Sequence, residues 1–150
     1  VNKIKYKLNN SIILHGGGWK KLENKKMSKK LFKQKLQEKF LISDVYNYYG
    51  LIEQTGSIFL ECKCGYFIST NFSEVIIRDK NLNEITKYHE EGLIQLISIL
   101  PSSYPGQNIL TEDVGELITR SKCNCEINGK RFIVKGRAKK AEIRGCSDAV

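Results

Sequence analysis

The chain has 150 residues, 41% hydrophobic and 9% aromatic, a composition typical of one folded domain that excludes an intrinsically disordered chain. No apolar stretch reaches the roughly 18 residues of a membrane-spanning helix, and five cysteines, an odd number, argue against a secreted disulfide framework. We therefore expect a cytoplasmic protein without a membrane span.

The net charge of +9 is distributed unevenly along the chain. Residues 1–40 hold 12 lysines and 2 glutamates, whereas residues 41–150 hold 13 basic and 14 acidic residues. Lysine lacks the fork with which arginine binds phosphate groups. We interpret the basic quarter as a solvated, lysine-rich face and expect no nucleic-acid partner; a nucleic-acid groove is the alternative.

Alternating polar and apolar residues predict a strand over residues 3–8. A second apolar strand begins at Ser11 and runs into Gly16, Gly17 and Gly18. Glycines permit backbone geometry and close approach that side chains would forbid. The three glycines therefore form either a tight turn or a backbone edge that lies against a ligand ring.

A helix is predicted from its Ser28 cap to about Leu41, because apolar residues recur every fourth position. It leads to a short strand that ends at Tyr49 and Gly50, with Glu53 three positions later. Such a strand end lies at the mouth of a sheet, where α/β folds bind ligands. An aromatic ring can stack on a base, and a carboxylate can hold a magnesium–phosphate complex. These two side chains are interpreted as half of a nucleotide site; an ordinary strand–turn junction is the alternative.

The chain becomes β-rich from Ser57, with short strands predicted at residues 57–62, 66–70, 74–79, 92–100 and 131–137. Asp113 is expected just before a glycine turn at a strand end. Its two oxygens match the two hydroxyls of a ribose, although a turn-forming aspartate is an equal alternative. Asn128 and Gly129 predict a hairpin turn before the last strand.

Four of the cysteines form two C-x-C pairs, Cys62 with Cys64 and Cys123 with Cys125. Alternate residues of a strand point to the same side, so the pairs can converge to four thiolates around a structural zinc ion. The usual zinc-ribbon spacing is C-x-x-C, and ordinary buried or surface thiols are the alternative.

The fifth cysteine, Cys146, lies near a second basic cluster. Between Lys130 and Arg144 there are seven basic residues and one acidic residue, and the arginines among them suit a phosphate or a carboxylate. Nearby cations lower the pKa of a thiol and favour the nucleophilic thiolate. Cys146 is thus a candidate nucleophile, and an idle cysteine is the alternative.

The order of these signals is more specific than each of them. The strings LHGGGWK, DVYNYYGLIEQTGSIFLE, SSYPGQNILTEDVGEL and CNCEINGKRFIVKGRAKKAEIRGCSD together resemble the acyl-protein synthetase family. These are the fatty-acid-activating subunits of the bacterial bioluminescence fatty-acid reductase and their relatives, within the adenylate-forming superfamily. The resemblance extends from about Ser11 to Asp148.

The resemblance implies a mixed α/β fold, the C-terminal portion of the large domain of an adenylate-forming enzyme. Residues 1–56 would form the strand–helix–strand part of its core. Residues 57–136 would form a β-rich subdomain, and residues 137–150 a hinge and a truncated tail.

The resemblance also implies ATP and Mg²⁺ as cofactors. The backbone of Gly16–Gly18 would line the adenine, and Tyr49, followed by Gly50, would stack on it. Glu53 would bind the magnesium of ATP, and Asp113 would hold the ribose hydroxyls.

Two further residues take roles from the resemblance. Arg137 would contact ribose or phosphate at the hinge, and Cys146 would accept the acyl group. A fatty acid would be activated as acyl-adenylate, transferred to a protein cysteine as a thioester, and passed to a reductase or carrier protein.

One departure from the family matters. Nothing in residues 1–10 resembles the phosphate loop that belongs upstream of these motifs. We therefore expect the C-terminal part of an enzyme, inactive alone, whose missing half is supplied by preceding sequence or by a separate N-terminal polypeptide. The alternatives are a zinc-ribbon-like binding module and a non-catalytic docking half.

Overall fold

The computed structural model describes residue 8, residues 10–18 and residues 24–138, in two compact units that divide between Asn47 and Tyr48. The strand predicted at residues 3–8 falls almost wholly outside the described residues, as does nearly all of the predicted hinge and tail. Within the described part of the chain, no helix is long and apolar enough to cross a membrane.

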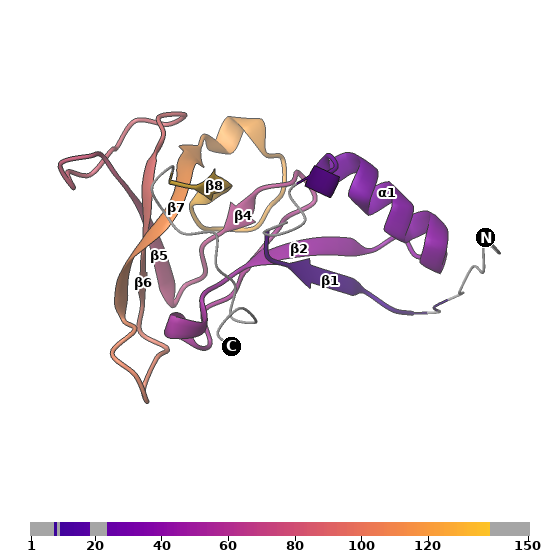
Figure 1. The fold of residues 1–150 in the computed structure, drawn as a ribbon, viewed down its shortest axis with the longest axis horizontal. Helices are drawn as coiled ribbons and strands as arrows, with labels where there is room; N and C mark the ends of the chain where they lie inside the picture. The colour runs from indigo at the N-terminus through magenta and orange to yellow at the C-terminus, as the bar shows by residue number, and fades with distance from the viewer. Residues whose placement is uncertain (1–7, 9, 19–23, 139–150) are drawn as a thin grey trace. The chain divides into compact units, whose positions relative to one another are not determined.

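The first unit contains β1 (Ile13–Gly16), α1 (Lys29–Phe40) and the beginning of β2 (Val45–Tyr49) (Figure 1). Helix α1 begins where predicted, because the Ser28 hydroxyl accepts a 3.2 Å hydrogen bond from the backbone N–H of Leu31. It ends at Leu41, whose backbone has the left-handed conformation and whose N–H donates a hydrogen bond to the carbonyl of Gln37. The strand–helix–strand prediction is confirmed.

The second unit is β-rich, as predicted. It contains the end of β2, the 3₁₀ turn η2 (Ile52–Gln54), β3 (Phe59–Leu60), β4 (Phe67–Ile68), β5 (Ser73–Arg78), β6 (Gly92–Ser98), β7 (Asn108–Ile118), the 3₁₀ turn η3 (Arg120–Lys122) and β8 (Arg131–Arg137). An antiparallel sheet has the order β4-β8-β7-β6-β5, and its long strands β5, β6 and β7 lie side by side in Figure 1. The end of β2 pairs with β3.

The core of this unit lies on one face of the sheet. Val75, Ile77, Ile94 and Leu96 are fully buried at alternate positions of β5 and β6. This alternation is the pattern of an antiparallel sheet with one covered face. Aromatic residues from β3, β4 and β8 complete the same cluster.

Two turn predictions were wrong. Asp113 does not precede a turn, because β7 continues through it to Ile118 with a register shift between Val114 and Gly115. A Cβ at Gly115 would clash with the backbone oxygen of Ile133, so glycine serves close strand approach there rather than a turn.

The predicted two-residue hairpin at Asn128 and Gly129 is the second error. Strands β7 and β8 do pair, but a longer connection that includes η3 joins them. Gly129 has φ +125°, and a Cβ on it would clash with the backbone oxygen of Ser69. Glycine is therefore needed where the connection passes the chain next to β4.

Candidate functional site

Tyr49 lies at the end of β2, and its side chain reaches across the second unit. Its ring packs against the rings of Phe59, Phe67 and Phe132, with centroid separations of 6.2, 5.9 and 6.0 Å. Its hydroxyl donates a 2.7 Å hydrogen bond to Oδ2 of Asp113. The structure thus brings together two of the residues that the sequence singled out.

The tyrosine hydroxyl is held in its protonated form. Burial raises the pKa of Tyr49, and the negative charge of Asp113 raises it further. A protonated hydroxyl beside a carboxylate acts as a donor. Tyr49 therefore fixes one oxygen of Asp113.

Arg137 is the third predicted residue at this place, because it is the direct cross-strand partner of Asp113. Its Nε lies 3.9 Å from Oδ1 of Asp113, and its Nη2 donates a 2.5 Å hydrogen bond to Glu112. The hydroxyl of Thr111 accepts from the backbone N–H of Asp113 at 3.1 Å and donates to the carbonyl of Ile94 at 2.8 Å. These contacts hold the strand that carries the carboxylate.

The sequence analysis missed Thr111 and Glu112 as parts of this site. The available signal was the alternation of β7, since Thr111 and Asp113 are two positions apart and share a face. The side chain of Asp113 is 20% exposed. A carboxylate has about four lone-pair sites, so Asp113 keeps acceptor capacity for the hydroxyls of a ligand.

Glu53 and Gly50 lie close in sequence to Tyr49 but in different surroundings. Glu53 is in η2 and, with the loop that contains Ser102 and Tyr104, lines a hollow of about 120 Å³. Asp113 is not among the residues that line it. A Cβ at Gly50 would lie 2.9 Å from a backbone oxygen, so this glycine permits close packing of the chain. Magnesium binding by Glu53 and nucleotide binding by Gly50 stay predictions.

The three consecutive glycines belong to the first unit. Gly16 is the last residue of β1, and Gly17 has φ +82°, which only glycine adopts readily. A Cβ added at Gly17 or Gly18 would have no atom of the described residues within 4 Å. Packing within the described chain therefore does not explain Gly18, and its contact with adenine stays a prediction. Cys146 lies outside the described residues.

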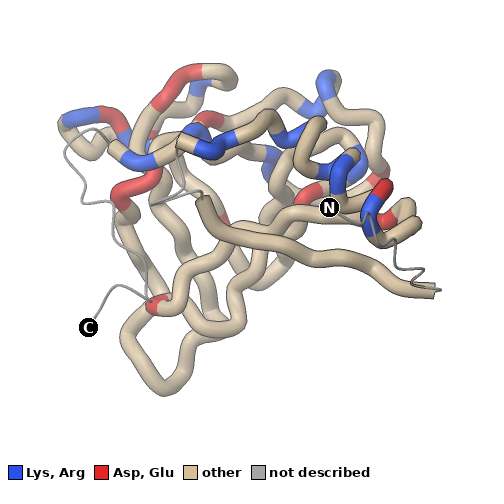
Figure 2. The backbone as a smooth tube through the Cα atoms, turned by 45° about the vertical axis from the view of Figure 1, so that its right-hand side comes forward, with Lys and Arg blue, Asp and Glu red and all other residues tan. Residues whose placement is uncertain are grey.

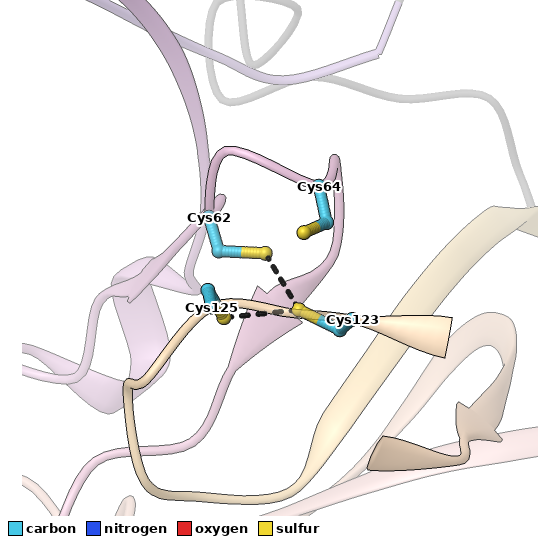
Figure 3. Close-up of side chains that lie close together, drawn as sticks. All are labelled: Cys62, Cys64, Cys123 and Cys125. Carbon is cyan, nitrogen blue, oxygen red and sulfur yellow. Dashed lines mark hydrogen bonds between the residues drawn. The ribbon is translucent and has the colours of Figure 1, made fainter. Parts of the chain in front are cut away.

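The two C-x-C pairs converge, as predicted. Cys62 and Cys64 lie in the turn between β3 and β4, and Cys123 and Cys125 follow η3 (Figure 3). The four sulfur atoms lie within 4.8 Å of one another. The Sγ atoms of Cys62 and Cys123 are 3.6 Å apart, and those of Cys123 and Cys125 are 2.9 Å apart. This set of ligands could hold a metal ion.

The thiols of this cluster titrate differently. Burial raises the pKa of the Cys62 thiol to about 12. Burial also acts to raise the pKa of the Cys123 thiol, but hydrogen bonds from Cys125 and from Arg131 together outweigh it and lower this pKa to about 6. The cluster therefore already stabilises a thiolate.

The family profile named "Acyl-protein synthetase, LuxE" matches residues 2–150. The chain belongs to the LuxE acyl-protein synthetase family. This match confirms the family that the sequence resembles. A search of curated proteins finds no match.

Solved structures of adenylate-forming enzymes share the fold of this LuxE family member. Apo MatB from Rhodopseudomonas palustris matches with a TM-score of 0.56 and 14% identity, over 85% of this chain and 26% of MatB. The A-PCP structure of McyG with phenylalanyl-adenylate matches with a TM-score of 0.57 and 15% identity, over 91% of this chain and 26% of that one. The N-terminal domain of FACL13 from Mycobacterium tuberculosis matches with a TM-score of 0.52 and 18% identity, over 83% of this chain and 31% of that one. The chain thus spans about a quarter to a third of these structures.

Proposed function

We propose that this chain supplies the ribose-binding part of an ATP-dependent ligase that activates a long-chain fatty acid. In the proposed reaction, a fatty acyl carboxylate attacks the α-phosphorus of ATP, and pyrophosphate leaves to give acyl-adenylate. A cysteine thiolate then attacks the carbonyl carbon of this mixed anhydride. The carbon–oxygen bond to phosphate breaks, AMP leaves, and a protein thioester remains.

The contact between Tyr49 and Asp113 is the observation that carries the proposal. Because the tyrosine hydroxyl occupies Oδ2, the carboxylate is held in one orientation, with its remaining lone pairs available to a cis diol. The guanidinium of Arg137 lies 3.9 Å from Oδ1 and would put a cation next to a nucleoside bound by Asp113. A fixed cation offsets negative charge that develops on the phosphates.

Other residues have roles in this proposal that rest on the family. Gly16–Gly18 would line the adenine, and Glu53 would bind Mg²⁺, which supplies positive charge to the phosphates of ATP. Cys146 would carry the acyl group before an acyl-accepting reductase or carrier protein takes it.

The chain alone is proposed to be inactive, because it spans only 26 to 31% of the adenylate-forming structures that it matches. The complete enzyme would be a longer polypeptide or a complex with a separate N-terminal polypeptide. The family match gives no support to a nucleic-acid-binding module. Figure 2 marks the basic and acidic positions of the described chain, in which α1 carries five lysines and one glutamate.

Titration of AMP and of magnesium–ATP into the complete enzyme tests the proposal. Asp113→Asn is expected to weaken AMP binding about tenfold or more, because a charge-assisted hydrogen bond to the ribose is lost. Glu90→Gln removes an exposed carboxylate with the same change in net charge and should leave Kd unchanged. Equal AMP affinity in the two variants would contradict the ribose-binding role.

The transfer step needs a separate measurement. With radiolabelled fatty acid and ATP, the complete enzyme is expected to form a hydroxylamine-sensitive acyl-protein. Cys146→Ser should lose this label while exchange between ATP and pyrophosphate continues. Undiminished labelling of Cys146→Ser would remove the carrier role and leave the adenylation proposal standing.

A further inference from the structure

The four cysteine sulfurs lie close enough together to bind a single metal ion. Zinc binds thiolates at about 2.3 Å in a tetrahedron, which places neighbouring sulfurs about 3.8 Å apart. Here all four sulfurs lie within 4.8 Å of one another, and two of the separations are 3.6 and 2.9 Å. An iron–sulfur cluster would insert its own iron and sulfide atoms and spread the thiolates further.

A buried arginine next to the cluster gives an independent observation. Arg131 is only 4% exposed, yet no carboxylate of the described residues pairs with it. Its guanidinium donates to the backbone oxygens of Gly129 and Ile127 at 2.9 and 2.7 Å, and Nη2 lies 3.6 Å from Sγ of Cys125. A buried cation is costly unless an anion lies nearby. The cysteine sulfurs are the groups in contact with it that can carry negative charge.

We propose that Cys62, Cys64, Cys123 and Cys125 bind one structural Zn²⁺ as thiolates, and that the guanidinium of Arg131 offsets the negative charge of this centre. Four thiolates and one Zn²⁺ carry a net charge of −2, so a single buried cation beside them is favourable. Each thiol that is still protonated releases its proton to solvent as its sulfur binds zinc. No oxidant or reductant is required.

The proposed ion would join two segments that the sheet holds together only weakly. Strands β4 and β8 share two paired positions, Phe67 with Phe132 and Ile68 with Arg131. The first cysteine pair lies just before β4, and the second precedes β8. The ion would therefore join β4 and β8 through cysteine side chains, in addition to the backbone hydrogen bonds between the two strands.

The backbone around Cys62 and Cys64 forms a tight turn of the kind that carries metal ligands. The N–H of Cys62 donates to the carbonyl of Tyr66 at 2.8 Å, and the N–H of Gly65 donates to the carbonyl of Cys62 at 2.9 Å. Gly65 has φ +85°, which closes the turn around Cys64. The turn is thus defined by backbone contacts and presents two sulfurs to one side.

Metal analysis of the chain, produced with zinc in the medium and purified under reducing conditions, tests the proposal. We expect one zinc ion per chain by mass spectrometry of the metal content. Replacement by Co²⁺ should give the sulfur-to-cobalt charge-transfer band and the strong red absorption of a tetrahedral thiolate site. Cys64→Ser, which alters a partly exposed ligand, should lose zinc to a competing chelator at least tenfold more readily. Cys146→Ser, the matched control that leaves the four proposed ligands unchanged, should retain it.

The role of Arg131 has its own variants. Arg131→Met is expected to weaken zinc binding about 10- to 100-fold in chelator competition, in the range seen when outer partners of a metal site are removed. Arg131→Lys, which keeps the charge, should restore part of this affinity, which a merely structural role would not predict. Equal affinities of these two variants would overturn the charge-offset role.

Other results would overturn the zinc site itself. One is a zinc-free chain that does not take up Zn²⁺ under reducing conditions. Others are a cobalt spectrum without thiolate charge transfer, iron with inorganic sulfide, or a disulfide within the cluster. Because these measurements use the unaltered chain, they decide the question even if a cysteine variant fails to fold.

Discussion

The hydroxyl of Tyr49 donates a 2.7 Å hydrogen bond to the carboxylate of Asp113, 64 positions further along the chain. This contact joins the end of β2 to the middle of β7 and connects the aromatic cluster to the candidate ribose site. The same tyrosine ring packs on Phe132, so one side chain contributes to both core stability and carboxylate orientation. Stability and ligand binding can therefore be separated by the choice of substitution.

Tyr49→Phe keeps the ring packing and removes the hydroxyl. We expect the free energy of unfolding to fall by about 1–2 kcal/mol, since a hydrogen bond to a charged group is lost. Denaturant unfolding measures this. Tyr104→Phe removes a hydroxyl from an exposed tyrosine and should change stability by less than about 0.5 kcal/mol. Equal effects of the two substitutions would show that the contact contributes nothing.

The contribution of Tyr49 to the free energy of unfolding should also depend on pH. An unfolded tyrosine loses its proton near pH 10, whereas burial and Asp113 raise the pKa of Tyr49 in the folded state. Above about pH 10 the folded state thus binds more protons than the unfolded state, and its stability falls as pH rises. The stability difference between the natural chain and Tyr49→Phe should narrow from about pH 8 to about pH 11. A constant difference over that interval would contradict the prediction.

Phe132 is fully buried and contacts the rings of Tyr49, Phe59 and Phe67. Phe132→Ala should lower the free energy of unfolding by about 3–5 kcal/mol, because the packed cluster cannot close around the cavity. Phe72 is 54% exposed, and Phe72→Ala should cost far less. Chemical denaturation of both variants compares them, and similar losses would disprove the assignment of the core.

Gly18→Ala distinguishes a structural glycine from one that lies against a ligand. A Cβ there meets no atom of the described residues within 4 Å, so stability should stay constant or rise by up to about 1 kcal/mol. If the glycines line adenine, magnesium–ATP binding to the complete enzyme should weaken about tenfold or more. Gly17→Ala, at φ +82°, should instead cost about 1–2 kcal/mol of stability. Unchanged ATP binding in Gly18→Ala would remove this glycine from the site.

Removal of zinc should lower the melting temperature of the chain. If the ion fixes the β4–β8 edge, a strong chelator should reduce Tm by about 5 °C or more, and added Zn²⁺ should restore it. In Cys64→Ser the chelator should cause little further change. Thermal unfolding followed by circular dichroism checks this, and an unchanged Tm in a chain shown to have lost its zinc would exclude a structural role.

Local signals in the sequence determined much of this protein. Ser28 marked the start of α1, and short apolar runs separated by turn residues marked the strands of the β-rich unit. Both depend on neighbouring residues, which a sequence displays directly. The order of the motifs also pointed to the acyl-protein synthetase family, which the match over residues 2–150 confirms.

Only the tertiary structure decided which distant residues meet. Gly115 reads as a turn in sequence, but the close approach of β8 makes it a bulge and keeps Asp113 inside β7, opposite Arg137. Arg131 follows Cys125 by only six positions, but the sequence does not show that its guanidinium is buried beside that sulfur. Spacing along the chain fixes local geometry, whereas burial and electrostatic pairing depend on contacts between segments far apart in sequence.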